Sequence, residues 1–339
     1  MTLAFDTPLP FHYHLPVGIK MDKLGWIIII TGIIAITIAI LLKGQLISLE
    51  YMEFPRDELE RLIITTDVPE QAPILTGPIE VQITSSWTRW AMRFSPGTFL
   101  VDVKINGHKT SLVVDTGAAK TAISPRVATA ARVSLTSSRL EAQHGKQDTP
   151  VYMGWVQELS LNDLKVSGVP IIVMGNQPVL KLFGIPVFYL GGLLGMETLQ
   201  LLAITLDYER GAVILRREAH NLQASWVPLR ILRDKGPGDM EHPRPIVDCL
   251  LEGYGPLPCW IDTGASAPVY VPPEVWGKLG LGDQKQARLK IKLGEVDLKD
   301  VPAVRARVPY TMIGSNIFQA QGIKRLTLDF LAGKLYAER

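Results

Sequence analysis

The chain carries almost no net charge. Its 339 residues hold 35 Lys and Arg against 33 Asp and Glu, which leaves a formal charge of +2. No basic stripe with interleaved aromatic residues occurs, so nucleic acid is not predicted as a partner. The six His residues are scattered without the spacing of metal ligands, and we predict no metal and no other cofactor. The GGLLG run at Gly191 lacks the Lys and the Ser or Thr that a phosphate-binding loop needs.

Cysteine is scarce too, with Cys249 and Cys259 as the two examples. Both lie in a predicted hairpin with its turn around Gly253 to Pro256, and a turn centred on Tyr254 would set them opposite each other. A disulfide is then feasible and would suit an oxidising compartment such as a bacterial periplasm. Two free buried thiols are the alternative. No Asn-x-Ser/Thr sequon occurs, so nothing indicates a glycosylated eukaryotic surface protein.

Charge is missing altogether from Leu24 to Leu42, LGWIIIITGIIAITIAILL. As a helix this run is about 28 Å long, enough to cross the core of a bilayer. It is longer than the core of a signal peptide, and no small-x-small cleavage site follows, so we predict an uncleaved single-pass anchor at 24–43. Lys residues on both sides leave the orientation open. A disulfide would favour a bacterial inner membrane protein with its C-terminal body in the periplasm.

The tripeptide Asp-Thr-Gly occurs twice, in LVVDTGAAK at Asp115 and in CWIDTGASA at Asp262. Two copies are expected by chance in about one chain in a hundred of this length. Each copy follows a short apolar run that ends the second strand of a predicted hairpin, with a turn at Asn106-Gly107 in the first case. A single copy could also be an ordinary turn after a strand, without a catalytic role.

Further segments repeat in the same order after each tripeptide. The matching pairs are ISPRVA (123–128) with VPPEVW (271–276), Val169-Pro170 with Val301-Pro302, LLGMETL with MIGSNIF, and ITLDYERGAVIL with LTLDFLAGKLY. This order indicates an internal duplication of two β-rich lobes. The predicted regions are a tail (1–23), a transmembrane helix (24–43), a stem (44–95), lobe 1 with a flap (96–220) and lobe 2 (221–339).

Lobe 1 contains two stretches without a counterpart in lobe 2. RLEAQHGKQDTPVYM (139–153) is predicted as a projecting hairpin with its turn at Gly145. The stretch between 173 and 192 is expected to be a loop near the cleft or an insertion that packs on it.

Four segments outside these motifs carry a structural prediction. In the stem, PRDELERLII is expected to form a helix from Pro55, and PIEVQIT alternates like a strand. The stem is too apolar for a free linker and is expected to pack on the body or on a partner. WVPLRIL is a predicted strand, and DKGPGDMEHPRP after it is a predicted mobile loop.

Residues 96–339 resemble the aspartic peptidases of the pepsin and retropepsin clan, and each half resembles small bacterial membrane-anchored retropepsin-like proteins. The resemblance implies a mainly β, bilobal pair of β-barrels with Asp115 and Asp262 as the catalytic dyad. It also implies an apolar-apolar-Gly brace behind each turn, ending at Gly195 and Gly314. A single flap on lobe 1 is the pepsin-like arrangement.

Two facing carboxylates suit peptide hydrolysis by water. One can take a proton from the water while the other protonates the substrate, and the pair can share one proton to do both. Like charges in contact cannot both stay ionised, so one carboxyl is pushed to a raised pKa. The sequence therefore predicts a water held between Asp115 and Asp262.

The residues after each Asp have predicted supporting roles. The hydroxyls of Thr116 and Thr263 would tie the two turns together, which the family calls a grip. Gly117 and Gly264 would let the backbone turn tightly and bring N–H groups to the carboxylates. The next residues are Ala118 and Ala265, which is more like retropepsins. A Ser at these positions could donate its hydroxyl to the carboxylate and favour its charged form, and this stabilisation is missing here. We therefore expect a less acidic working pH than in pepsins.

We predict a membrane-anchored aspartic endopeptidase that binds extended peptide or protein substrates. Its other predicted partners are the bilayer, through 24–43, and further membrane subunits, through the tail and stem. One alternative is a non-enzymatic scaffold of protease fold in a larger membrane complex, respiratory or photosynthetic. Another is a receptor that binds peptides in the cleft without cutting them.

Overall fold

The computed structural model describes residues 47–53, 61–65, 72–85, 88, 97–144, 147–182, 185–219, 222–235, 241–265 and 268–339. The chain divides into a compact unit of 1–48 with 181–186 and a second unit of 49–180 with 187–339. Apart from 181–186, both lobes belong to the second unit. Among the described residues, no helix has the length and apolar character to cross a bilayer. The predicted tail, the predicted span 24–43 and Gly145 fall outside the described residues.

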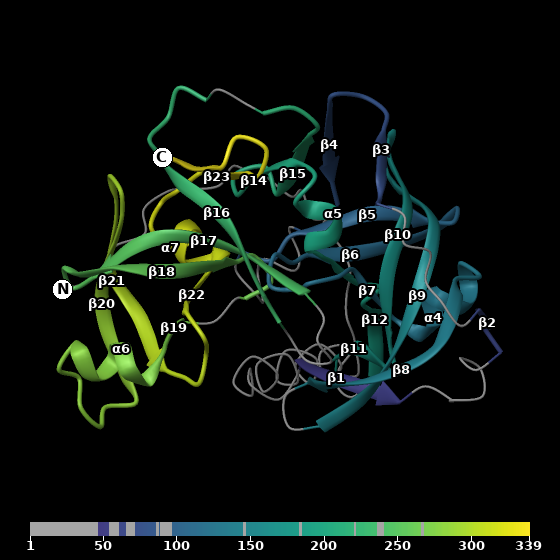
Figure 1. Cartoon of the computed structure of the whole chain (residues 1–339), viewed down its shortest axis with the longest axis horizontal. Helices are drawn as coiled ribbons and strands as arrows, with labels where there is room; N and C mark the ends of the chain where they lie inside the picture. The colour runs from purple at the N-terminus through teal and green to yellow at the C-terminus, as the bar shows by residue number, and fades with distance from the viewer. Residues whose placement is uncertain are drawn as a thin grey trace, which may run out of the picture. The chain divides into compact units, whose positions relative to one another are not determined.

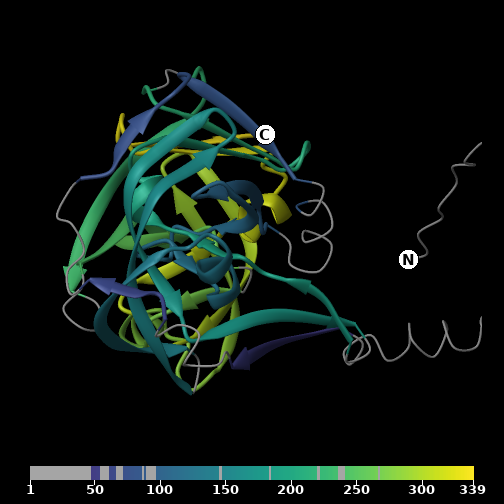
Figure 2. The ribbon, with the colours of Figure 1, turned by 90° about the vertical axis from the view of Figure 1, so that its right-hand side faces the viewer.

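Six strands of lobe 1 close into a barrel, in the order β9-β5-β6-β13-β7-β10 with β10 pairing again with β9. Their bounds are Leu100–Ile105 (β5), His108–Val114 (β6), Ala122–Ile123 (β7), Gln147–Leu161 (β9), Leu164–Met174 (β10) and Gly192–Leu194 (β13). Burial alternates along β5, as expected for a strand with one face on a core. Figure 2 turns the blue and teal strands of this lobe toward the viewer.

Lobe 2 repeats this closure in the order β18-β22-β19-β21-β20-β17, with β17 pairing again with β18 (Figure 1). The bounds are Glu241–Leu251 (β17), Tyr254–Asp262 (β18), Val269–Val271 (β19), Gln286–Leu293 (β20), Val296–Arg305 (β21) and Thr311–Gly314 (β22). Each strand occupies the place of its counterpart in lobe 1, with β17 matching β5 and β22 matching β13. The mainly β, bilobal and duplicated architecture predicted from the repeats is therefore confirmed.

Six further strands continue the lobe 2 sheet beyond β17 and join the lobes, in the order β16-β24-β23-β14-β15-β4. Their bounds are Glu80–Thr84 (β4), Ala203–Asp207 (β14), Ala212–Arg216 (β15), Trp226–Lys235 (β16), Arg325–Asp329 (β23) and Lys334–Glu338 (β24). At their centre β14 of lobe 1 pairs antiparallel with β23 of lobe 2, and Thr205 is the partner of Thr327. Their hydroxyl oxygens are 2.8 Å apart and buried, so matching residues of the two lobes meet here.

The lobes also interlock through side chains. The rings of Phe99 and Tyr208 lie 5.3 Å apart, and both residues are buried. The Tyr208 hydroxyl donates to the Ser315 carbonyl in lobe 2 at 3.0 Å. The Ser315 hydroxyl in turn donates to the Gly97 carbonyl in lobe 1 at 2.6 Å. These contacts hold the start of β5 against lobe 2.

Among the described residues, four short helices lie against the barrels: Pro125–Ala130 (α4), Met196–Leu199 (α5), Pro273–Lys278 (α6) and Ser315–Ala320 (α7). Proline opens both α4 and α6, as the matched ISPRVA and VPPEVW segments predict. The Ser124 hydroxyl caps α4 by accepting the Val127 N–H at 3.4 Å.

The two extra stretches of lobe 1 form strands. Ser134–His144 (β8) pairs with β9 up to His144 and Gln147, which gives the predicted hairpin. Asn176–Leu182 (β11) and Ile185–Tyr189 (β12) form a small sheet with Ile47–Glu53 (β1). The second stretch is therefore strands, where a loop was one expectation.

The stem predictions have mixed outcomes. PIEVQIT contains β4 and WVPLRIL lies in β16, so both strand predictions are confirmed. The helix prediction is wrong at its C-terminal end, because Ile63–Thr65 (β2) is a strand that pairs with β8; most of PRDELERLII lies outside the described residues. Ile74–Thr76 (β3) pairs with β10, so this part of the stem packs on the body.

Two predictions around β17 are wrong. EHPRP belongs to β17 and pairs with β16 along a long hairpin, because the side chains around Arg244 are buried, whereas a loop was predicted. The turn before β18 is at Glu252-Gly253, so the register shifts by two residues. Cys259 is then opposite Val247 rather than Cys249.

Candidate active site

Both Asp-Thr-Gly turns lie at the end of a barrel strand that is held by a parallel neighbour. Asp115 follows β6, whose register with β13 places Leu194 beside Val114. The Asp115 N–H donates to the Leu194 carbonyl at 3.0 Å. Asp262 ends β18 and lies in register with Gly314 of β22. The predicted apolar-apolar-Gly segments thus lie directly beside the two turns.

Thr116 and Thr263 make four hydrogen bonds across the lobes, two of them with each other. The Thr116 hydroxyl donates to the Ile261 carbonyl at 2.7 Å and accepts the Thr263 N–H at 3.0 Å. The Thr263 hydroxyl donates to the Val114 carbonyl at 2.7 Å and accepts the Thr116 N–H at 3.0 Å. Both side chains are buried, so neither hydroxyl can replace a lost partner with bulk water.

Gly117 and Gly264 each do two things. Each N–H donates to the carboxylate of its own turn, at 2.7 Å to Asp115 Oδ1 and at 2.9 Å to Asp262 Oδ1. A Cβ added at Gly117 would lie 2.5 Å from Asp262 Oδ2, and one at Gly264 would overlap the Asp115 carboxyl group. The carboxyl of each lobe therefore packs on the glycine of the other lobe, which brings the two carboxyls face to face.

Burial makes both carboxyls harder to ionise. Burial first, and then the Asp262 charge, raise the pKa of Asp115 to about 8. Burial also raises the pKa of Asp262, against the N–H groups of Gly264 and Ala265, which donate to its Oδ1 at 2.9 and 3.0 Å. Asp115 Oδ1 accepts the Gly117 N–H at 2.7 Å, and the N–H groups of Gly117 and Ala118 both act to lower the pKa of Asp115. The Asp262 charge and the hydrogen bond between the two carboxyls raise the pKa of Asp115, whereas the same hydrogen bond and the Arg244 charge lower the pKa of Asp262. Asp262 is therefore the better place for the negative charge, and Asp115 for the shared proton.

The predicted braces leave no room for side chains. A Cβ at Gly195 would overlap the main chain of Lys120, and one at Gly314 would overlap the Ala265 carbonyl. The Gly195 N–H donates to the Thr121 hydroxyl at 3.0 Å. These contacts fix the chain that follows each catalytic turn.

The sequence analysis missed Glu197, which lies two residues after the first brace glycine. It is 8% exposed. Its Oε2 accepts the Thr121 N–H at 2.6 Å and its Oε1 accepts the Thr198 hydroxyl at 3.1 Å. Burial raises the pKa of Glu197 to about 6. The signal was present in the repeat, because GME of lobe 1 aligns with GSN of lobe 2 and so sets an acid against Asn316.

His242 and Arg244 were missed as well, because the Gly- and Pro-rich composition of their segment predicts a loop. His242 Nε2 lies 3.0 Å from the Gly117 carbonyl, in the catalytic turn of the other lobe. Arg244 is buried and donates from Nε to both carboxylate oxygens of Asp234, at 2.9 and 3.1 Å. Its guanidinium lies 4.6 Å from the ring centre of Trp260.

The remaining predicted site residues lie elsewhere. The β8–β9 hairpin is the only part of the predicted flap that can be placed, because its tip Gly145 lies outside the described residues. Cys249 and Cys259 are joined in a disulfide and both are buried in lobe 2. They reach each other diagonally across the β17–β18 hairpin.

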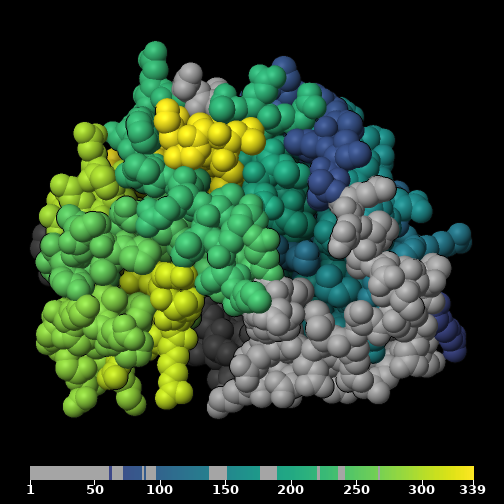
Figure 3. Space-filling model, in the orientation of Figure 1, coloured from purple at the N-terminus to yellow at the C-terminus, as the bar shows by residue number. Residues whose placement is uncertain are grey.

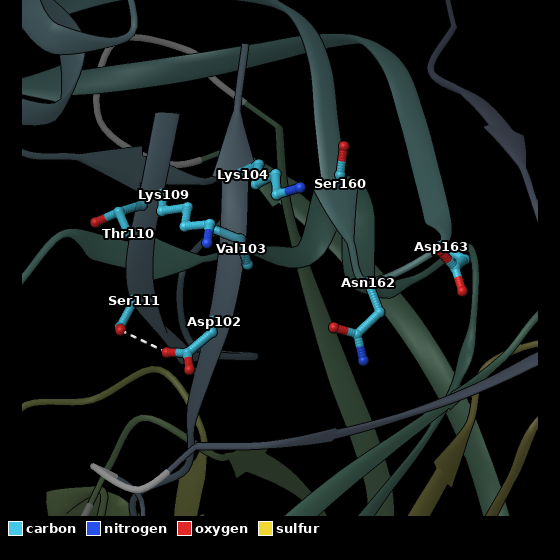
Figure 4. Close-up of a pocket in the computed structure, with 9 residues that line it drawn as sticks. All are labelled: Asp102, Val103, Lys104, Lys109, Thr110, Ser111, Ser160, Asn162 and Asp163. Carbon is cyan, nitrogen blue, oxygen red and sulfur yellow. Dashed lines mark hydrogen bonds between the residues drawn. The ribbon is translucent and has the colours of Figure 1, made fainter. Parts of the chain in front are cut away.

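A separate hollow of about 710 Å³ opens on the outer face of lobe 1 (Figure 4). Lys104, Lys109 and Asn162 line it, and Ser111 donates to Asp102 at 2.7 Å. It contains neither carboxyl of the dyad. In the part of the chain that the structure describes, no three His, Cys, Asp or Glu side chains gather as metal ligands.

Comparison with known proteins gives one family match. Residues 101–200 match the family described as "gag-polyprotein putative aspartyl protease". A retropepsin-like aspartic protease from Rickettsia conorii is similar, with 17% identity and a TM-score of 0.29 over 40% of this chain and 98% of that one. The aspartic proteinase from Irpex lacteus is similar at 12% identity and a TM-score of 0.45, over 76% of this chain and 97% of that one. No curated protein sequence matches the chain.

The family match covers residues 101–200 of lobe 1, which include the first Asp-Thr-Gly turn. Lobe 2 repeats the barrel and the turn of lobe 1. The match, the paired barrels and the facing carboxyls together support an aspartic peptidase.

Proposed function

We propose that the protein is an aspartic endopeptidase that hydrolyses extended peptides with a water held between Asp115 and Asp262. One observation carries the proposal: each carboxyl packs on the turn glycine of the opposite lobe. Two carboxyls in that arrangement share one proton, which gives a base and an acid at one place. A plain structural turn does not need such a juxtaposition.

The reaction follows from the unequal surroundings of the two carboxyls. Ionised Asp262 takes a proton from the water while the water oxygen forms a bond to the peptide carbonyl carbon. Protonated Asp115 gives its proton to the carbonyl oxygen, so a neutral tetrahedral diol forms. The C–N bond then breaks as Asp262 returns its proton to the leaving nitrogen and Asp115 recovers the diol proton. Both carboxyls end in their starting states.

The proposed substrate is a peptide in extended form. A strand-like peptide can bind through its main chain to the edges that line a cleft between two β lobes. The β8–β9 hairpin, which lobe 2 lacks, is the proposed cover over such a peptide. The proposed partners are therefore peptides or unfolded segments of proteins.

We also propose that residues 24–43 anchor the enzyme in a membrane. The support is the uncharged apolar run from Leu24 to Leu42. The Cys249–Cys259 disulfide favours an oxidising compartment for the body, such as a bacterial periplasm. A single-pass inner membrane protein with its C-terminal body outside the cytoplasm fits both observations.

The test is cleavage of a mixed peptide library by the full chain in detergent, from pH 3 to 8, followed by mass spectrometry. An Asp115→Asn, Asp262→Asn double variant shows what the dyad does, and Asp163→Asn, which changes an exposed carboxyl of lobe 1, is the matched control. We expect the parent and the control to cut and the double variant not to cut. Peptides that the folded parent retains but leaves intact would indicate a receptor. If the folded parent neither cuts nor retains peptides, the scaffold alternative is favoured.

A further inference from the structure

The two aspartates have different neighbours on the lobe 2 side. β16 and β17, shown in green, cross the middle of Figure 1, and their side chains cover the centre of the same face in Figure 3. Asp234 of β16 and His242 of β17 are cross-strand partners, and Arg244 shares their face of the hairpin. This group, called here the lobe 2 triad, is Asp234, His242 and Arg244.

The triad forms a chain of hydrogen bonds that ends on the catalytic turn of lobe 1. The Gly117 carbonyl can only accept, so His242 Nε2 carries the hydrogen of their 3.0 Å contact. His242 Nδ1 then faces Arg244 Nη2 at 3.4 Å and can accept from it. Arg244 is bound at its Nε by Asp234. The order is Asp234, Arg244, His242 and Gly117.

Arg244 is held from a further side. Its side chain is 11% exposed, and its guanidinium stacks on Trp260, two residues before Asp262 on β18. The His242 ring also meets Trp260, edge to face, with centres 5.8 Å apart. A long side chain fixed by an ion pair and an aromatic ring keeps its charge in one place.

Lobe 1 has no such group at the matching positions. Val113 and Trp260 are equivalent, because each lies two residues before the catalytic Asp of its lobe. Their cross-strand partners, Leu100 in lobe 1 and Ile246 in lobe 2, are therefore equivalent as well. Two residues before this aligned pair, Thr98 corresponds to Arg244, and four residues before it, Pro96 corresponds to His242. At these matching positions the sequence therefore supplies a cation on the Asp262 side and none on the Asp115 side.

The charge of Arg244 acts on Asp262. After burial, the two backbone donors and the hydrogen bond from Asp115, the Arg244 charge also acts on Asp262, and it lowers the pKa of that carboxyl. The influences on Asp115 are burial, Asp262 and its own turn. His242 itself has a lowered pKa, through burial and then the Arg244 charge, so its ring is neutral at neutral pH. The charged or titratable groups that face the ring are Arg244, Asp234 and, beyond Gly117, the dyad.

We propose that Arg244 and His242 are positioning residues that make the two aspartates unequal. Arg244 keeps Asp262 as the charged base, and His242 holds the Gly117 carbonyl so that the turn of Asp115 stays in place as the acid. The proposal rests on the endopeptidase function above. It adds to that function a reason why Asp262 is the base and Asp115 the acid, which two equivalent turns alone would not give.

The test compares full-chain variants in detergent on one peptide that the parent cuts. We expect Arg244→Met to lower kcat by about tenfold or more with KM changed by less than about threefold, because the site loses its charge pattern and not its contacts with substrate. The acidic limb of the kcat/KM profile should move up by about half to one pH unit. Arg244→Lys should restore part of both effects. Arg233→Met, on the same hairpin but exposed, is the control and should match the parent.

His242 is tested in the same way. His242→Ala should lower kcat, and His242→Gln should recover much of it, because an amide N–H can still donate to the Gly117 carbonyl. Loss of activity in Arg244→Met and Arg244→Lys with an unshifted acidic limb would overturn the proposal, since a merely structural role predicts that result.

A second readout needs no substrate. The carboxyl carbon of Asp262, followed by NMR against pH, should titrate higher in Arg244→Met than in the parent. An unchanged Asp262 titration in the folded Arg244→Met variant would overturn the proposal. Failure of the parent to cut any peptide would instead reject the endopeptidase function and leave this titration to decide the influence of Arg244.

Discussion

Substitution of Glu197 by Gln should remove a pH-dependent part of the stability. The carboxyl lies buried behind the catalytic turn of lobe 1 and accepts from the Thr121 N–H and the Thr198 hydroxyl. Gln can keep both contacts, with its oxygen on Thr121 and its amide group on the Thr198 hydroxyl, which can also accept. The change therefore removes the charge and leaves the shape.

The magnitude follows from the raised pKa of Glu197, which moves from 4.5 in an ordinary setting to about 6 in the fold. A rise of that size corresponds to about 2 kcal/mol. Because the folded protein holds the proton more tightly than the unfolded chain, this contribution is complete below about pH 4.5 and is lost as the pH rises past 6. The parent should therefore lose about 2 kcal/mol more than Glu197→Gln between pH 4 and pH 8.

The assay is unfolding of the full chain by urea in detergent, followed by tryptophan fluorescence at a series of pH values. The difference in unfolding free energy between parent and variant isolates Glu197, since the dyad titrates in both proteins. Glu209→Gln is the matched control, because that carboxyl is exposed in the same lobe. A parent-minus-variant difference that stays constant from pH 4 to 8 would refute the reasoning.

Three further results are expected from the same unfolding assay. Asp115→Asn should be more stable than the parent at pH 8 but not at pH 4. Burial raises the pKa of Asp115, so the parent loses stability as the pH rises toward 8. The same pH dependence of the unfolding free energy in both proteins would contradict this. Thr116→Val should cost about 2–4 kcal/mol, since two buried partners lose their bonds, whereas exposed Thr129→Val should change little. Replacing Cys249 and Cys259 by Ser should cost about 2–3 kcal/mol, the loop entropy of a link across 10 residues, and reduction should change the parent but not the variant.

The sequence was informative where a feature was local and repeated. Asp115 and Asp262 were recognised because the tripeptide and its flanks occur twice in the same order, and this order also predicted the two barrels. The same repeat predicted that the hydroxyls of Thr116 and Thr263 make hydrogen bonds between the two lobes. Such features need no knowledge of long-range register.

The residues that were missed act across the chain. His242 meets Gly117 over 125 positions of sequence, and no periodicity links them. The Gly- and Pro-rich run before His242 was interpreted as a loop, although cross-strand pairing and the burial of Arg244 hold EHPRP in β17. The cysteine register failed for a related reason, because the exact turn between two strands decides which residues are opposite.

The central claim is that a water is activated between Asp115 and Asp262. The most direct test is the rate at which the full chain in detergent cuts one selected peptide, measured for the parent and for Asp262→Asn at the pH optimum of the parent. The substitution keeps the shape and the N–H contacts at Oδ1 but removes the base. We predict a rate lower by about a hundred- to ten-thousandfold. Equal rates for the two folded proteins would contradict the account.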